Sequence, residues 1–405
     1  MSDFINTIDA LGDDALSDSL FDRTITEFAD NTLTSISDNG FRSCELLAII
    51  NLPNVTTLGS NTFNSCRSLT EVTLSSIDIL GDNVFEGCTS LKTINISTAT
   101  SLGKGIFKNC SEIESINMPD ITVIPDETYN GCTLLKNIDL SNIVSIGDNA
   151  FANCTSLTDD NLIAPNLESI NIGSFTGCSL ITTINFPKLT TITSSAEKPT
   201  FSNCPLLSTI DMPMLTSTGS YAFYNCTALT SINMPNLETV NNRAFYNCQS
   251  LPIISFEKVT TVEDYGFRYC NKLTHIDLPN VTSIGQGAFY NCVSLTSVNM
   301  PNLTTIANEG FYLCSTLTKI DLASVESIGV SGFYYCRRLS AVIIRKPNVV
   351  LQNSNVFKDT LIESGTGYIY VPAEYVATYK TATNWSVYAD QIRAIEDYTS
   401  ITGGI

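Results

Sequence analysis

The chain has 405 residues, of which 43% are hydrophobic and 15% are charged, and its formal net charge at pH 7 is −19. The hydrophobic content suffices for a packed core and excludes an intrinsically disordered chain. The excess of acidic residues argues against nucleic acid and anionic membrane surfaces as partners, because both attract lysine and arginine. No apolar run approaches the roughly 18 residues of a membrane-spanning helix, so no membrane insertion is expected.

Residues 1–22 are strongly acidic, with six aspartates and neither lysine nor arginine. The spacing of Phe4, Ile5, Ile8 and Leu11 is typical of a helix. One interpretation is a polar cap over the first coil of a repeat array, and the other is docking onto a larger assembly. The segment has neither the basic start nor the apolar centre of a secretory signal.

The stretch 23–345 is built on a period of 22 residues, with one gap of 24 and one of 26 between successive cysteines. Phenylalanine stands three residues before each cysteine, except at Tyr129, and leucine or isoleucine stands three residues after it. Such a period predicts a solenoid, in which each coil buries its apolar face against its neighbours. The fourteen cysteines are Cys44, Cys66, Cys88, Cys110, Cys132, Cys154, Cys178, Cys204, Cys226, Cys248, Cys270, Cys292, Cys314 and Cys336.

Each coil is expected to contain one strand followed by a second apolar turn. Leu229 to Met234 alternates like a half-buried strand, and Pro235 ends it. Leu237 and Val240 then turn the chain back. Glycine often follows, as at Gly285, where a tight turn is predicted.

The cysteines are expected to be buried free thiols, because each occupies the same place in its coil between inward-facing Phe and Leu. A disulfide framework links dissimilar positions and would break this regularity. A ladder of small hydrophobic thiols suits a reducing compartment or an anaerobic exterior.

Two coils carry insertions, near residues 158–160 and at residues 194–199. Insertions in repeat proteins map to loops, and some of these loops bind partners. Both insertions are short and polar, so tolerated drift is the simpler interpretation.

After Cys336 the period is lost, and residues 346–397 are expected to form a capping module. A loop is predicted over 347–367, a strand over 368–371, and helices over 373–381 and 386–395. Trp385, the only tryptophan, is expected to pack this module onto the last coil. Residues 398–405 are expected to form a flexible tail.

The repeat resembles that of the BspA-like leucine-rich repeat family of bacterial surface and phage-associated proteins. The shared pattern is Leu-x-x-Ile-x-φ-Pro-x-φ-x-x-Ile-Gly-x-x-Ala-Phe-x-x-Cys, where φ is apolar, and it covers about residues 23–345. The resemblance implies an α/β repeat solenoid, a right-handed superhelix of about fourteen 22-residue coils. A parallel sheet on one face and a small α/β C-terminal cap are expected with it. It also implies adhesion or protein binding without chemistry, and it fixes no ligand.

No catalytic, cofactor or metal site is predicted. The single histidine, His275, has no cysteine or histidine at metal-ligand spacing and is interpreted as a surface residue. A serine hydrolase would have to pair it with Asp277, and no nucleophile-elbow sequence is present. The aspartates of the strand face are spread along the array, which suits Ca²⁺ poorly.

Tyrosine is distributed unevenly: of the 16 tyrosines, only Tyr129 precedes residue 221. A stacked stripe is predicted two residues before successive cysteines, and Tyr and Arg are enriched in recognition surfaces. The alternative is that Phe-Tyr-Asn-Cys is merely the usual turn of such repeats. The stripe, here the candidate partner-binding site, consists of Tyr224, Tyr246, Arg268, Tyr290, Tyr312 and Tyr334.

The preferred hypothesis is a non-enzymatic recognition or adhesion module that binds a protein or a cell-surface glycan. The acidic start without a secretory signal favours a phage or prophage virion protein of tail or fibre type, displayed on a virion or cell surface. The alternative is an intracellular, cytoplasmic protein-binding scaffold, which free thiols would suit.

Overall fold

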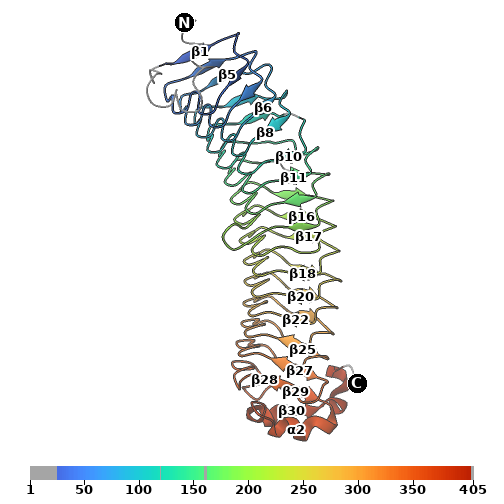
Figure 1. The fold of residues 1–405 in the computed structure, drawn as a ribbon. Coiled ribbons are helices and arrows are strands. Elements are labelled where there is room, and N and C mark those ends of the chain that lie inside the picture. Colours follow the sequence, from blue (N-terminus) through green and yellow to red (C-terminus); the bar gives the residue numbers. More distant parts are fainter. Residues whose placement is uncertain (1–24, 119, 159–161, 403–405) are drawn as a thin grey trace. The chain divides into compact units, whose positions relative to one another are not determined.

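The computed structural model describes residues 25–118, 120–158 and 162–402. The chain is a solenoid of parallel strands with about 16 turns, which confirms the predicted fold with slightly more coils than expected (Figure 1). It divides into two compact units, Met1–Leu189 with Glu197–Leu207 (unit 1) and Thr190–Ala196 with Ser208–Ile405 (unit 2). Within the described ranges, no helix is long and apolar enough to cross a membrane. The predicted docking segment, residues 1–22, lies outside them.

Most coils contain two short strands, and strands in equivalent positions of neighbouring coils pair in parallel within several short sheets. In unit 1 the first strands are β1 (Glu27–Ala29), β3 (Ile49–Asn51), β5 (Glu71–Thr73), β7 (Thr93–Asn95), β9 (Ser115–Asn117), β12 (Leu162–Ile163) and β14 (Thr183–Asn185). The second strands there are β2 (Ser35–Ile36), β4 (Thr57–Leu58), β6 (Ile79–Leu80), β8 (Ser101–Leu102), β10 (Val123–Ile124), β11 (Ser145–Ile146) and β13 (Ser169–Ile170).

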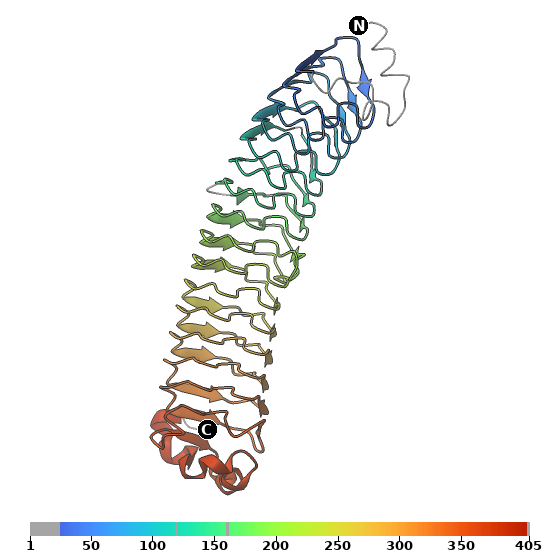
Figure 2. The same ribbon diagram turned by 90° about the vertical axis from the view of Figure 1, so that its left-hand side faces the viewer.

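Unit 2 repeats this arrangement, and Figure 2 shows its two strand series on different sides of the coils. Its first strands are β16 (Thr209–Asp211), β17 (Ser231–Asn233), β19 (Ile253–Ser255), β21 (His275–Asp277), β23 (Ser297–Asn299), β25 (Lys319–Leu322), β27 (Ala341–Ile344), β29 (Tyr368–Val371) and β30 (Ile392–Ala394). Its second strands are β15 (Thr191–Ile192), β18 (Thr239–Val240), β20 (Thr261–Val262), β22 (Ser283–Ile284), β24 (Thr305–Ile306), β26 (Ser327–Ile328) and β28 (Val350–Leu351).

The core is a ladder in which equivalent side chains stack from coil to coil. Phe245 is fully buried, and its ring centroid lies 5.3 Å from that of Phe223 and 5.2 Å from that of Phe267, with nearly parallel planes. The 22-residue period places each ring against its equivalents in both neighbouring coils. Every coil therefore closes the apolar surface of the coil before it.

The cysteines confirm the predicted ladder of thiols: all fourteen are free and buried. Each thiol for which a bond is described donates to the carbonyl of an aromatic residue one coil earlier. Cys66 Sγ lies 3.1 Å from the Phe41 carbonyl, and Cys248 Sγ lies 3.4 Å from that of Phe223. Cysteine thus fills a small apolar space and also satisfies a backbone acceptor between coils.

Thiol chemistry tests this ladder. Burial raises the pKa of the Cys204 thiol to about 12, and it raises the pKa of most of the other ladder thiols as well. Native protein at pH 8 is therefore expected to react slowly with iodoacetamide, whereas denatured protein should yield close to fourteen alkylated cysteines by mass spectrometry. Rapid alkylation of the native chain, or disulfide-linked peptides in a digest, would contradict the packing.

The recurrent glycines at the end of the second strand are explained by close approach between coils. A Cβ atom on Gly59 would lie 2.5 Å from the backbone nitrogen of Asp38, and one on Gly285 would lie 2.5 Å from that of Asp264. Neither glycine has a positive φ. Turn residues follow directly after both glycines, and what excludes a side chain at the glycine itself is the backbone of the preceding coil.

The repeat continues beyond Cys336, contrary to the predicted loss of the period. The stretch 347–367 is not simply a loop, because it contains β28, and Phe357 stacks on Phe333 with centroids 5.6 Å apart. This coil has no cysteine, so the spacing that marks the others could not reveal it. Helices, among the described residues, occur only after Val371.

The cap has the predicted strand β29 and the first predicted helix, formed by the 3₁₀ helix η1 (Ala373–Tyr375) and α2 (Val376–Thr381). The second predicted helix is wrong in its C-terminal part: the 3₁₀ helix η2 covers Ser386–Gln391, and strand β30 follows it. There Ile392 pairs with Ile369 of β29, so tertiary pairing overrides the local pattern. The chain then forms η3 (Ile395–Tyr398) and α3 (Thr399–Thr402).

Candidate functional site

The predicted stripe lies entirely in unit 2, on the turns that lead from each second strand to the next cysteine. The structure brings all six residues into one row of half-buried side chains. Tyr224 stacks on Tyr246 with centroids 4.7 Å apart, and Tyr312 stacks on Tyr290 at 4.7 Å and on Tyr334 at 5.3 Å. The equivalent position in unit 1 carries no tyrosine and holds residues such as Arg42, Asn64, Glu86 and Lys108.

Arg268 connects the two halves of the stripe. Its guanidinium carbon lies 4.0 Å from the ring centroid of Tyr290 and 4.9 Å from that of Tyr269, whose hydroxyl accepts a hydrogen bond from Nη2 at 3.2 Å. Tyr269 in turn meets Tyr246 and Tyr290 edge to face. The row therefore continues without a gap through the coil that lacks a tyrosine two residues before its cysteine.

The surface is wider than the sequence pattern indicated, because tyrosine and arginine also occur five residues and one residue before the cysteine. Arg243 lies over Tyr221 at 5.3 Å and over Tyr265 at 4.5 Å, and Arg268 lies 5.0 Å from Tyr265. Tyrosine and arginine thus alternate across neighbouring coils. We call Tyr221, Arg243, Tyr265, Arg268 and Tyr290 the arginine–tyrosine ladder.

Sequence reasoning missed these flanking residues, although aligning the coils position by position would have shown them. Tyr221, Arg243 and Tyr265 follow one another at intervals of 22 residues. Tyr335 is a further flanking member, with its centroid 4.5 Å from that of Tyr334.

Several of the flanking residues adopt a left-handed backbone conformation, which is costly for large side chains. The φ angles are 59° at Tyr221, 51° at Arg243, 59° at Tyr265 and 64° at Tyr269. In most other coils the same positions carry asparagine, glycine or serine, whereas Glu127, Glu309 and Leu313 adopt this conformation as well. The asparagines include Asn39, Asn61, Asn83, Asn149 and Asn247. Unit 2 therefore carries tyrosine and arginine where stability alone favours asparagine or glycine.

The hydroxyl groups along the stripe remain neutral and mostly unpaired. Burial raises the pKa of the Tyr246, Tyr290 and Tyr312 hydroxyls, so these groups stay protonated at neutral pH. None of the three forms a hydrogen bond to another residue of the described chain. They are donors and acceptors at the surface that a partner can use.

The two ladder arginines have no carboxylate partner among the described residues. The ion pairs there involve other cations, such as Arg345, whose Nη2 lies 2.8 Å from an Asp321 oxygen. The Arg268 Nε donor is buried without an acceptor. Since a buried unpaired donor costs about 1–3 kcal/mol, the ladder is not optimised for stability alone.

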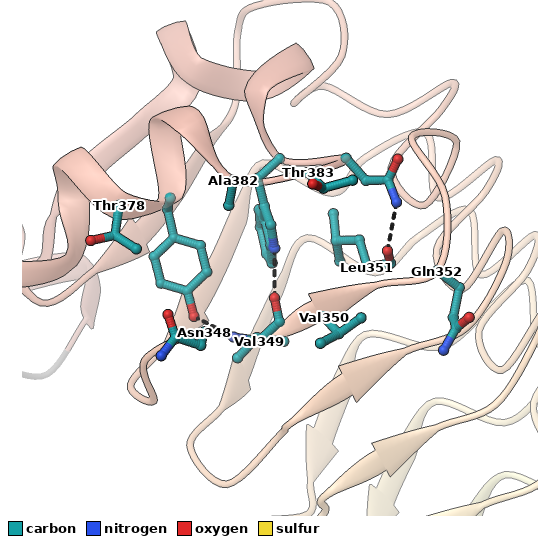
Figure 3. Close-up of a pocket in the computed structure, with 11 residues that line it drawn as sticks. Asn348, Val349, Val350, Leu351, Gln352, Thr378, Ala382 and Thr383 are labelled. Atoms are coloured by element: carbon teal, nitrogen blue, oxygen red, sulfur yellow. Dashed lines mark hydrogen bonds between the residues drawn. The ribbon is translucent and has the colours of Figure 1, made fainter.

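A pocket of about 400 Å³ lies between β28 and the cap (Figure 3). Its polar groups are already engaged: Trp385 Nε1 donates to the Val349 carbonyl at 2.7 Å, and Asn384 Nδ2 donates to that of Leu351 at 2.8 Å. This space therefore supports packing of the cap rather than recognition of a ligand.

The strand face of unit 2 carries the predicted asparagine and aspartate row. Asn299 Nδ2 donates to Asp277 at 2.6 Å, and Asn233 Nδ2 donates to Asp211 at 2.7 Å. His275 is half-buried in the first position of β21. In the part of the chain that the structure describes, no group of His, Cys, Asp and Glu side chains is arranged to hold a metal ion.

Comparison with known proteins agrees with the fold. Residues 12–134, 100–213, 195–302 and 260–367 match the family model described as BspA type leucine rich repeat region. A leucine-rich repeat protein from Bacteroides ovatus is 21% identical, with a TM-score of 0.51 over 71% of this chain and 86% of its own. At that identity it supports the fold alone.

Two further solved structures are similar over most of their lengths. A leucine rich cell surface protein from Faecalibacterium prausnitzii is 22% identical, with a TM-score of 0.39 over 68% of this chain and 83% of its own. An internalin from Listeria monocytogenes is 13% identical, with a TM-score of 0.24 over 68% and 80%. No curated protein matches the chain in sequence.

Proposed function

We propose, from the premise that this chain belongs to the BspA-type leucine-rich repeat family, that it is a non-enzymatic recognition module binding a protein partner through the turns of unit 2. The family consists of repeat proteins that serve typically as binding modules. The binding surface we assign is the stripe together with its flanking residues Tyr221, Arg243, Tyr265, Tyr269 and Tyr335. A glycan partner is the second candidate.

The observation that carries this proposal is the choice of residues at strained positions. A non-glycine residue in the left-handed region costs roughly 1–2 kcal/mol, and asparagine tolerates it better than tyrosine or arginine does. Tyr265 and Tyr269 retain this cost, whereas Asn247 occupies the position of Tyr269 one coil earlier. Retained strain of this kind is characteristic of functional sites.

The stripe also has the composition of a binding hot spot. Tyrosine and arginine offer large, rigid surfaces with polar ends, and a few such residues commonly supply most of the binding free energy. Mutual stacking holds Tyr290 and Tyr312 in place, so little side-chain entropy remains to be lost on binding. Whether the module is displayed on a virion or on a cell surface stays a prediction.

A triple substitution tests the proposal. Tyr246→Asn, Tyr269→Asn and Tyr290→Asn replace three neighbouring rings with the residue that other coils carry at these positions. We expect the fold to be retained with a lower melting temperature, since lost packing of about 1–2 kcal/mol per half-buried ring exceeds the strain of about 1–2 kcal/mol that is relieved at Tyr269. Binding to a partner identified from a panel of purified extracellular proteins should fall at least tenfold.

The matched control alters the strand face of the same coils. Ser231→Ala, Ile253→Ser and Ser297→Ala change side chains that stand exposed on β17, β19 and β23. This variant is expected to bind as the unaltered chain does. Normal binding by the tyrosine variant together with weak binding by the control would place the site on the strand face instead, and binding confined to a glycan array would favour the second candidate.

A further inference from the structure

We infer that the arginine–tyrosine ladder, through Arg243 and Arg268, binds a carboxylate-rich peptide segment of a protein partner. This inference rests on the proposed function and specifies the chemistry of the partner. It follows from the charge that the ladder leaves uncompensated, from the parts of its aromatic rings that stay accessible, and from the charge of the chain around it.

Two guanidinium groups lie close to the ring of one tyrosine, Tyr265. Their central carbons lie 4.5 Å and 5.0 Å from the Tyr265 ring centroid, so they are less than 10 Å apart. The arginines make no ion pair in the described part of the chain, although the net charge of the chain is −19. Both positive charges are therefore available to an external anion.

The acidic residues that precede the ladder tyrosine are already used within the solenoid. A Glu263 carboxylate oxygen accepts a hydrogen bond from the backbone nitrogen of Asn242 at 2.8 Å. Asp264 Oδ1 accepts one from the backbone nitrogen of Gln286 at 2.7 Å. These bonds direct the two carboxylates to neighbouring backbone, and neither carboxylate forms an ion pair with Arg243 or Arg268 in the described part of the chain.

The rings of the ladder present edges rather than free faces. Arg243 and Arg268 both lie over Tyr265, and Tyr290 has Arg268 on its ring at 4.0 Å and Tyr312 stacked at 4.7 Å. A nucleobase needs an open aromatic face for stacking, and a sugar ring stacks in the same way. What remains accessible are the ring edges, which carry partial positive charge, and the Tyr290 hydroxyl; the Tyr221 hydroxyl already accepts a hydrogen bond from Arg243 Nη1 at 2.7 Å.

A carboxylate fits this set of groups. Guanidinium binds carboxylate through two parallel hydrogen bonds, and positively polarised ring edges and phenolic donors surround the same space. Chains of dense negative charge, such as nucleic acid, are disfavoured because the chain as a whole repels them. A short segment with a few Asp or Glu residues among apolar ones meets both conditions, since Tyr312 and Tyr334 continue the surface beyond the arginines.

Fluorescence anisotropy with the full-length chain tests the inference. The probe is a fluorescein-labelled dodecapeptide of three Ser-Leu-Glu-Tyr repeats, and the matched peptide carries Ser-Leu-Gln-Tyr. The acidic peptide should bind and the amide peptide should bind at least tenfold more weakly. Arg243→Gln with Arg268→Gln should weaken the acidic peptide at least tenfold, and raising sodium chloride from about 50 to 500 mM should weaken it as well.

The control Lys272→Gln with Lys380→Gln removes the same charge from exposed side chains outside the ladder and should leave binding unchanged. Equal loss in this variant would show a non-specific charge effect and overturn the inference, as would equal binding of both peptides. Binding of fluorescein-labelled heparin but not of the acidic peptide would assign the arginines to a sulfated glycan.

The two proposals fail in different ways. If the acidic peptide does not bind while the tyrosine variant still loses the panel partner, the ladder chemistry is wrong and the binding surface stands. If the peptide binds through the arginines while the tyrosine variant keeps its panel partner, the proposed binding surface is wrong and the ladder chemistry stands. Thermal unfolding of each variant shows whether the fold is retained.

Discussion

Replacing Phe245 by alanine is expected to lower the free energy of unfolding of the surrounding coils by about 3–5 kcal/mol. The ring is fully buried and stacks between Phe223 and Phe267 at 5.3 and 5.2 Å. Its removal leaves a cavity that the neighbouring coils cannot close, because each is held in register by strand pairing, as between Thr239 and Thr261. Denaturation in urea, followed by circular dichroism, measures the loss.

The same substitution is expected to change the shape of the unfolding curve. Coils interact only with their neighbours, so a weak coil in the middle of unit 2 should let the flanking coils unfold at different denaturant concentrations. Gln249→Ala, which truncates an exposed side chain in the same coil, should change stability by less than about 0.5 kcal/mol. A Phe245→Ala variant that unfolds in one step at the original midpoint would refute nearest-neighbour packing.

Removing the indole of Trp385 is expected to release the cap from the last coil, with a loss of about 3–5 kcal/mol in Trp385→Ala. The side chain is 1% exposed, and its ring lies 4.8 Å from that of Tyr379. Its Nε1 donates to the Val349 carbonyl, which otherwise would have no partner at the end of the sheet.

The register of the second strands explains why the Val349 carbonyl needs a hydrogen-bond donor from the cap. The carbonyls of Ile328 in β26 and of Glu326 just before it accept hydrogen bonds from the next coil, from the backbone nitrogens of Gln352 and Val350. The equivalent carbonyls of the last coil belong to Val349 and Leu351, and side chains of Trp385 and Asn384 take the place of a further coil. The cap thus supplies the hydrogen-bond donors that a further coil would otherwise provide to the carbonyls of the last second strand.

Trp385→Phe separates the two contributions of the indole. It keeps most of the buried ring and removes the donor, so about 1–3 kcal/mol of the loss should remain because the Val349 carbonyl is left unpaired. Hydrogen exchange of the β28 amides should accelerate in both variants and should stay slow in unit 1. Unchanged exchange at β28 would mean that the cap does not protect the end of the sheet.

The sequence alone determined the solenoid, because a solenoid can be recognised from the order of residues along the chain. A coil that touches only its neighbours must repeat its inward residues at a fixed interval, so Phe245, Cys248 and Leu251 identify the core without knowledge of any distant contact. The strand after the cysteine followed from the same argument. The stripe also followed, since equal positions in successive coils must lie side by side.

The sequence could not reveal the features in which a coil deviates from the pattern that the other coils share. Phe357 continues the phenylalanine stack without a cysteine to mark it, and residues 392–394 form a strand because β29 offers them an edge. Neither feature depends on local propensity.

The chemistry of the candidate site was decided by tertiary structure for the same reason. Arg243 and Arg268 occupy different positions in their coils, and only the path of the turns brings both onto the Tyr265 ring. The left-handed backbone at Tyr265 and Tyr269 is likewise a property of the turn, since asparagine or glycine would fit it at lower cost. A period reveals which residues are equivalent, whereas contacts between positions that are not equivalent exist only once the coils are stacked.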